Sequence, residues 1–194
     1  MKYCVVNSRS KSVVLIGMMG AGKSAVGSCL QRRTSLGLLD TDAIVASKFG
    51  CSIPEIFTRY GEESFREAET KALRELSNPK QAIIVTAGGG IVLREENIDL
   101  LKRLGVVVWL DGDEGTLFER AFRATDRPLL KTENPRRTFS QMLQARLPLY
   151  AKTAHMRVDT AVLTEEEVAV AILSKLRRIG RNWRPGSQIP ATAR

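Results

Sequence analysis

The amino-acid sequence predicts an α/β fold of three layers, α/β/α, in which helices cover both faces of a parallel β-sheet. Short apolar runs without alternating polar residues, such as residues 13–16, are typical of strands buried on both faces. Segments with apolar residues at helical spacing lie between these runs, so strands and helices alternate along the chain. This alternation predicts a layered domain in which right-handed crossovers join the strands.

Five segments are the expected strands. Residues 13–16, 82–85 and 106–110 are continuous apolar runs, whereas 36–39 and 156–158 are weaker candidates.

Three of the expected helices each carry an apolar stripe that can pack against a sheet. The stripes are Val26, Cys29 and Leu30; Phe139, Met142 and Leu143; and Val168, Ala171, Ile172 and Ile179. The last helix is expected to begin at Thr164, where Glu167 completes a capping box at the positive end of the helix.

The chain has 194 residues, 43% of them apolar, which is the balance of a globular protein with one core. We expect a single domain over residues 1–178 and a basic tail at 179–194, which contains helix-breaking residues. The longest uncharged stretch, 81–93, is shorter than the ~20 residues that span a bilayer. The first residues turn polar too soon for an export signal. The sequence therefore predicts no membrane association and a cytoplasmic location.

Cysteine usage agrees with that location. Cys4, Cys29 and Cys51 are odd in number, widely separated and match no zinc-binding spacing. We expect three reduced thiols.

The formal net charge is +9, from 30 basic and 21 acidic residues. It has two interpretations: binding to nucleic acid, or a small-molecule site that handles phosphate and carboxylate groups. Five arginines in residues 177–194 supply over half of the excess, so the total charge is weak evidence for nucleic acid.

Residues 17–24, Gly-Met-Met-Gly-Ala-Gly-Lys-Ser, fit the phosphate-loop pattern G-x-x-x-x-G-K-[ST] between an expected strand and an expected helix. Glycines let backbone N–H groups surround a phosphate, Lys23 reaches the β- and γ-phosphates, and the Ser24 hydroxyl is a ligand for Mg²⁺. The expected ATP-binding residues of this loop are Gly20, Ala21, Gly22, Lys23, Ser24 and Ala25.

Two further motifs follow expected strands, where ligands of open α/β sheets bind. Asp40-Thr41-Asp42 offers two carboxylates, one for Mg²⁺ and one for a substrate hydroxyl, although any of the three residues can instead cap the next helix. Gly88, Gly89 and Gly90 end another strand, and three glycines there allow an approach to the backbone that a Cβ atom would block.

Three arginines stand within distinctive motifs: Arg66 in Phe-Arg-Glu-Ala-Glu, Arg127 in Asp-Arg-Pro-Leu-Leu and Arg146 in Arg-Leu-Pro-Leu-Tyr. A guanidinium group can hold a carboxylate through two parallel hydrogen bonds, which Lys cannot do. For any single arginine, a solvated surface charge is the simpler interpretation.

Taken in order, these motifs resemble the shikimate kinase family over about residues 15–159. The resemblance implies a P-loop kinase fold of the nucleoside-monophosphate-kinase type and transfer of the ATP γ-phosphate to the 3-hydroxyl of shikimate. It also implies Mg²⁺ as cofactor, shikimate and ATP as the small-molecule partners, and a monomer.

The resemblance also assigns roles to individual residues. Asp42 would be the catalytic base, Asp40 and Ser24 would hold the metal, and Lys23 and Arg127 would act on the phosphate. The implied shikimate-binding residues are Asp42, Arg66, Gly88, Gly89, Gly90 and Arg146, with Glu69 orienting Arg66. Arg127 would lie on a lid spanning about residues 123–137, and Arg120 against adenine. Residues 161–164 depart from the family pattern, so the opposite side of the adenine site stays unassigned.

Two alternatives remain open. A related small-molecule kinase, such as a gluconate kinase, shares the phosphate loop but does not predict Arg66 and Arg146 as a pair around Asp42. A nucleotide-sensing or nucleic-acid-binding module has only the net charge in its favour, and no base-stacking motif is present in the sequence.

Overall fold

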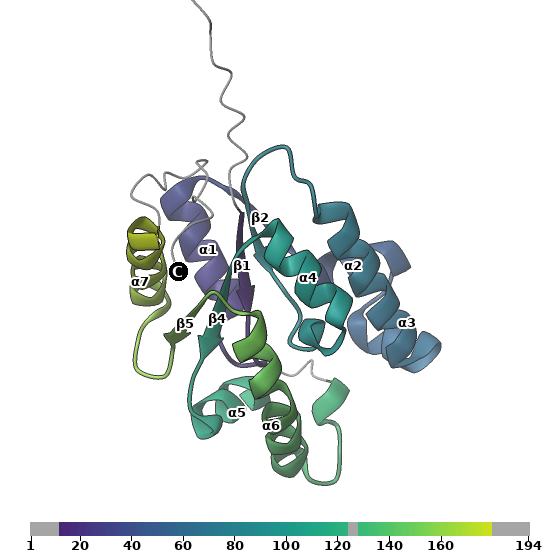
Figure 1. The fold of residues 1–194 in the computed structure, drawn as a ribbon. Helices are drawn as coiled ribbons and strands as arrows, with labels where there is room; N and C mark the ends of the chain where they lie inside the picture. Colours follow the sequence, from purple (N-terminus) through teal and green to yellow (C-terminus); the bar gives the residue numbers. More distant parts are fainter. Residues whose placement is uncertain (1–11, 124–127, 180–194) are drawn as a thin grey trace, which may run out of the picture.

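The computed structural model describes residues 12–123 and 128–179, and its five strands form one parallel sheet in the order β2-β3-β1-β4-β5 (Figure 1). The strands are β1 (Ser12–Ile16), β2 (Gly37–Asp40), β3 (Ile83–Thr86), β4 (Gly105–Asp111) and β5 (Met156–Asp159). All five predicted strands are therefore confirmed.

The position of each strand explains how clearly the sequence predicted it. β1 pairs with β3 on one side and β4 on the other, and both β1 and β4 are buried along their whole length. β2 and β5 form the two edges of the sheet, where several residues stay exposed. The weaker apolar patterns thus belong to the edge strands, because an edge strand has less apolar surface to bury.

Helices cover both faces of the sheet, which confirms the predicted α/β/α layers. The helices are α1 (Lys23–Thr34), α2 (Thr41–Phe49), α3 (Ile53–Leu76), α4 (Glu95–Leu104), α5 (Glu114–Arg123), α6 (Pro135–Thr153) and α7 (Glu165–Ile179), with short 3₁₀ helices η1 (Ile91–Leu93) and η2 (Pro128–Leu130). α1 and α7 pack against each other, whereas α4 contacts α3 and α6 (Figure 1). The crossovers from β1 to β2 and from β3 to β4 run in opposite directions along the sheet, so right-handed connections put α1 and α4 on opposite faces.

The predicted capping box of α7 is present. The Thr164 hydroxyl accepts a hydrogen bond from the N–H of Glu167, and the Glu167 carboxylate accepts one from the N–H of Thr164. Glu166 in the same turn pairs with Arg32 and Arg33 at the end of α1, at 2.6 and 2.8 Å. This contact joins the two helices on that face of the sheet.

α3, which has 24 residues, is not among the helices that the sequence predicted. Ser52 and Glu55 form a capping box at its start, with Pro54 in the first turn. Gly61 interrupts it with φ 80° and ψ 166°, a backbone conformation that side chains with a Cβ atom rarely adopt. The break at Gly61 separates the first turns of α3 from its second half, which is rich in charged residues. Because the helix is interrupted there, its apolar residues do not follow one continuous helical period in the sequence.

α2 and α3 pack against each other through a separate buried cluster of Val45, Ile56, Phe65 and Ala72. In the described ranges, no helix has both the length and the apolar character needed to cross a bilayer.

The predicted lid, residues 123–137, is only partly within the described residues, because 124–127 lie outside them. Its last three residues are helical: α6 begins at Pro135, and the Asn134 side chain accepts a hydrogen bond from the N–H of Arg137. The predicted tail begins at 179, and α7 ends at that residue; residues 180–194 lie outside the described part of the chain.

We predict that Gly105→Ala lowers the free energy of unfolding by about 1–3 kcal/mol, the usual cost of overpacking a core. A Cβ atom at Gly105 would overlap the Ser12 carbonyl, because β4 begins directly beside β1 at that point. Chemical denaturation measures the change.

Gly37→Ala is the matched control, because Gly37 also begins a strand but a Cβ atom there would lie 3.7 Å from its nearest neighbour, Ile83 Cγ2. Equal stability of the two variants would contradict this account of the β1–β4 contact.

Candidate active site

A cavity of about 660 Å³ lies at the carboxyl ends of β1, β2 and β3, the edge at which open α/β sheets bind ligands. The predicted ligand-binding residues that line it are Gly20, Gly22, Lys23, Ser24, Ala25, Asp40, Asp42, Arg66, Gly88, Gly89, Gly90, Arg120 and Arg146. Ala21 is not among them, because it is buried and its N–H donates to the Met18 carbonyl at 3.2 Å. Motifs far apart in the sequence therefore meet in one cavity.

The loop between β1 and α1 has the geometry of a phosphate site. Gly20 and Gly22 have φ of 86° and 79°, values that glycine adopts without strain. Gly22 is the N-cap of α1 and provides no side chain to bind the first N–H groups of the helix. The positive end of the helix dipole and these N–H groups therefore border the cavity, as in sites that bind phosphate.

The Lys23 ammonium lies over this loop, where it donates to the carbonyl oxygens of Gly17 and Met18 at 2.9 and 3.0 Å. These bonds hold a positive charge next to the N-terminus of α1. The phosphate end of the cavity therefore has both a fixed charge and a set of backbone donors.

The two aspartates of Asp40-Thr41-Asp42 have different surroundings. Asp40 is the N-cap of α2: its Oδ1 accepts from the N–H groups of Asp42 and Ala43, and its Oδ2 accepts from the Thr86 hydroxyl at 2.7 Å. The capping interpretation is thus confirmed for Asp40. Asp42 is in the first turn of α2, half-buried, and lines the cavity.

The three glycines after β3 make room for charged side chains of the protein itself. A Cβ atom at Gly88 would lie 2.5 Å from Asp42 Oδ1 and 2.7 Å from Glu69 Oε1, and one at Gly90 would overlap the Arg66 guanidinium. The Thr41 hydroxyl accepts a hydrogen bond from the Gly88 N–H at 3.0 Å. The glycine run is therefore the surface against which the acidic and basic groups of the site are packed.

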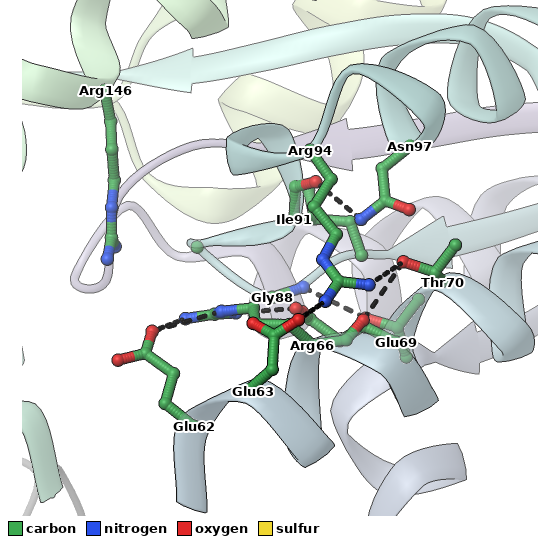
Figure 2. A network of polar contacts seen from close by, with 12 residues as sticks. Glu62, Glu63, Arg66, Glu69, Thr70, Gly88, Ile91, Arg94, Asn97 and Arg146 are labelled. Atoms are coloured by element: carbon green, nitrogen blue, oxygen red, sulfur yellow. Dashed lines mark hydrogen bonds and ion pairs between the residues drawn. The ribbon is translucent and has the colours of Figure 1, made fainter.

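Arg66 is buried on α3 and pairs with two carboxylates (Figure 2). Its Nη1 donates to Glu69 Oε2 at 2.6 Å, whereas its Nε and Nη2 donate to Glu62 Oε1 at 3.2 and 2.9 Å. Burial alone would lower the pKa of Arg66, but the ion pairs with Glu69 and Glu62 raise it overall. The predicted role of Glu69 in orienting Arg66 is consistent with this contact.

Glu69 is fully buried, and its second oxygen, Oε1, has no hydrogen-bond partner among the described residues. Burial raises the pKa of Glu69 to about 7; the ion pair with Arg66 opposes that shift, and the nearby charge of Asp42 adds to it. A carboxyl group with this pKa carries a proton for part of the time at neutral pH.

Arg146 lies on α6, lines the same cavity as Arg66 and is 5% exposed. Its hydrogen-bond acceptors are two thioethers, Met18 Sδ at 3.8 Å and Met142 Sδ at 3.7 Å, and the Tyr150 hydroxyl lies beside it. Within the described ranges, no carboxylate lies within ion-pair distance of Arg146. A buried guanidinium held by such weak acceptors is a strong site for an anion.

Tyr150, one helical turn after Arg146, fixes the glycine run to α6. Its hydroxyl donates to the Gly89 carbonyl at 2.5 Å, and burial raises its pKa to about 12. The Arg-x-Pro-x-Tyr motif thus provides both the guanidinium and the support for the backbone opposite it.

Arg120 of α5 also lines the cavity. Its guanidinium donates to the carbonyls of Thr160 and Ala161 at 3.0 and 3.4 Å. Arg127 lies outside the described residues, so its predicted role on the phosphate stays a prediction.

The cavity also has an apolar wall that is not among the predicted site residues. It consists of Ile53, Phe57 and Phe65 of α3. The rings of Phe57 and Phe65 pack together with centroids 5.0 Å apart. The capping box at Ser52 and the i, i+4 spacing of Ile53 and Phe57 are the sequence features that indicate this wall.

Comparison with known proteins identifies the family. The model of the family described as shikimate kinase matches residues 19–177. A shikimate kinase from Thermodesulfovibrio yellowstonii is 41% identical over 169 residues, which cover 87% of this chain and 96% of that protein. The chain belongs to the shikimate kinase family.

Solved structures agree with this membership. A shikimate kinase from Acinetobacter baumannii in complex with shikimate superposes with a TM-score of 0.84 at 35% identity, covering 88% of this chain and 95% of that one. A shikimate kinase from Aquifex aeolicus gives 0.74 at 34% identity, with coverage of 86% and 96%. The predicted P-loop kinase fold is confirmed, and the family match favours shikimate kinase over the gluconate kinase alternative.

The residues beside the phosphate loop are suited to Mg²⁺. The Ser24 hydroxyl and the Asp40 carboxylate border the same part of the cavity, and Mg²⁺ binds through one or two protein oxygens together with substrate phosphates and water. Among the described residues, no cluster of three or more His, Cys, Asp or Glu side chains forms a metal site. The site therefore fits a metal that arrives with its nucleotide rather than one held by the protein alone.

We predict that Glu69 makes the protein less stable as the pH rises from 4.5 to about 7. Its pKa is near 7 in the folded chain and near the usual glutamate value of about 4.3 when unfolded, so the folded state binds the proton more tightly. The Glu69→Gln variant should lose this decrease, which amounts to at most about 3 kcal/mol at roughly 1.4 kcal/mol per pKa unit. The measurement is denaturant unfolding between pH 4 and 8.

Glu75→Gln is the control, because the pKa of Glu75 shifts in the direction opposite to that of Glu69. A hydrogen bond from Lys48 lowers the pKa of Glu75, so this change should alter the pH dependence only below about pH 4.5. A Glu69→Gln variant with the wild-type slope would show that Glu69 is ionised throughout this range.

Proposed function

We propose that this chain transfers the γ-phosphate of ATP to the 3-hydroxyl of shikimate. The observation that carries the proposal is that one cavity is lined both by a phosphate loop and by the buried guanidinium of Arg146, which has no carboxylate within ion-pair distance among the described residues. Shikimate has one carboxylate, which the arginines can bind, and hydroxyl groups, which can accept and donate hydrogen bonds in the rest of the cavity. A neutral polyol would leave Arg146 unpaired and is disfavoured.

The apolar wall also supports a cyclic acceptor. Ile53, Phe57 and Phe65 present an aliphatic and aromatic surface to the cavity that the phosphate loop and the arginines also line. One face of a cyclohexene ring can pack against such a surface, whereas a linear polyol such as gluconate gains less from it.

In this mechanism, the protein positions the reactants and neutralises charge, which is most of what phosphoryl transfer requires. Lys23 and the N-terminus of α1 bind the phosphates. Arg66 and Arg146 bind the carboxylate of shikimate, with the backbone of Gly88, Gly89 and Gly90 beside the ring. Asp42 accepts the proton of the attacking 3-hydroxyl.

The remaining roles rest on the family resemblance. Ser24 and Asp40 would hold Mg²⁺, which neutralises phosphate charge when bound, Arg120 would lie against adenine, and Arg127 would contact the transferred phosphate. We also propose that the protein acts as a cytoplasmic monomer without a nucleic-acid partner.

A coupled assay of ADP release tests the proposed function. Shikimate should support turnover, whereas gluconate and a neutral polyol of similar size should not, because neither combines a ring with a carboxylate at the required position. Turnover that is equal with gluconate, or absent with shikimate, would contradict the proposal.

We predict that Arg146→Lys raises the KM for shikimate about tenfold or more, because a single ammonium cannot replace two parallel hydrogen bonds to a carboxylate. The KM for ATP should change little, since Lys23 and the N-terminus of α1, rather than Arg146, are the groups proposed to bind the phosphates. Steady-state kinetics with each substrate varied in turn measures both constants.

Arg103→Lys is the control for Arg146→Lys, because it makes the same exchange at an exposed position of α4. An unchanged KM for shikimate in Arg146→Lys would remove Arg146 from the carboxylate site.

A further inference from the structure

Glu62 is a charged neighbour of the substrate site that the proposed mechanism does not use. Figure 2 shows its carboxylate next to the Arg66 guanidinium, on the side away from Glu69. Glu62 Oε1 accepts from Arg66 Nε at 3.2 Å and from Nη2 at 2.9 Å. Nε and Nη2 form the side of a guanidinium that offers two parallel N–H groups to a carboxylate. Glu62 thus lies where an acidic substrate would bind side-on to Arg66.

The two glutamates that hold Arg66 are not equivalent. The side chain of Glu69 is 0% exposed, whereas that of Glu62 is 49% exposed. Release of Glu62 would return its carboxylate to water at little cost, but release of Glu69 would leave a buried charge unpaired. Glu62 also directly follows the helix break at Gly61, so it stands at the first turn of the second half of α3. Glu62 is therefore the exchangeable partner of Arg66, and Glu69 the permanent one.

Charge balance favours an exchange over simultaneous binding. Arg66 and Arg146 line the cavity, Glu62 and Glu69 already pair with Arg66, and the Asp42 carboxyl lies close enough to Glu69 to raise its pKa. A substrate carboxylate would add a further negative charge and would be repelled by its neighbours. Departure of Glu62 removes one of these charges and frees the two N–H groups that a carboxylate needs.

We propose that Glu62 occupies Arg66 in place of the substrate carboxylate and leaves when shikimate binds, so that it sets the affinity for the substrate and excludes small inorganic anions from Arg66. This inference rests on the proposed function, because it takes the carboxylate of shikimate as the group that replaces Glu62. Glu62 thus lowers the affinity of Arg66 for every anion, so a small anion that contacts Arg66 alone is bound too weakly to occupy the site. Only a ligand with further contacts in the cavity overcomes that competition.

The test is the variant Glu62→Gln, which keeps the size of the side chain and removes its charge. The KM for shikimate should fall about two- to fivefold, the scale of a half-exposed ion pair. The kcat and the KM for ATP should stay at the wild-type values. Sulfate, used as a competing anion, should inhibit the variant competitively with shikimate at a lower concentration than it inhibits the wild type.

Glu67→Gln is the matched control, because Glu67 is an exposed glutamate of the same helix, whereas the described carboxylate partners of Arg66 are Glu62 and Glu69. It should leave the KM for shikimate and the sulfate inhibition unchanged. An effect equal to that of Glu62→Gln would indicate a general effect of net charge and would overturn the proposal.

A KM for shikimate that is unchanged or raised in Glu62→Gln would also overturn the proposal, and a raised KM would show that Glu62 supports Arg66 during binding. In either case, wild-type turnover of shikimate in the same assay leaves the proposed function standing. Absence of wild-type turnover would instead contradict the proposed function, and with it the exchange that depends on it.

Discussion

Two guanidinium groups buried beside one cavity impose the constraint on which the rest of this site depends. Arg66 and Arg146 are 7% and 5% exposed, and burial of an unpaired charge costs several kcal/mol of stability, on the order of 3–5 when a partner is lost. The protein stabilises these two buried charges with different partners. Arg66 has carboxylate partners, whereas Arg146 has thioethers and a phenol that are weak acceptors. The cavity therefore has one guanidinium already neutralised and one that gains most from an incoming anion.

The parallel sheet brings these charges to one edge. β3 lies between β2 and β1, so the glycine run that follows it lies between the Asp40-Thr41-Asp42 segment after β2 and the phosphate loop after β1. Gly88 and Gly90 then allow the Asp42 and Arg66 side chains to approach the backbone more closely than any Cβ atom would permit. The glycines thus determine how far apart the acidic and basic groups of the site can be.

The sequence was sufficient to predict the strands, the phosphate loop and most of the residues that meet in the cavity, because each depends on a local pattern. Continuous apolar character predicts residues 13–16 as a strand. Spacing alone predicts Gly20 to Ser24 as part of a phosphate loop. Glu62 could not be found in this way, since its importance comes from its contact with a buried guanidinium one helical turn later, and the burial of Arg66 depends on packing that the sequence pattern does not show. The wall at Phe57 escaped prediction because the break at Gly61 interrupts the helical period of α3. The role of Asp40 as both cap and cavity residue likewise required the Thr86 contact from another strand.

The order of charges along the cavity limits which acceptors can react. In the proposed function, Lys23 and the N-terminus of α1 bind the triphosphate, and the guanidinium groups that line the same cavity bind a carboxylate. Asp42 lies in the cavity with them, close enough to Glu69 for its charge to raise the pKa of that residue. A negatively charged Asp42 repels the substrate carboxylate and accepts hydrogen bonds from hydroxyl groups. In the proposed mechanism, a hydroxy acid therefore binds in one orientation, with its carboxylate away from Asp42 and a hydroxyl beside it, and this orientation would place the attacking oxygen between Asp42 and the phosphate loop.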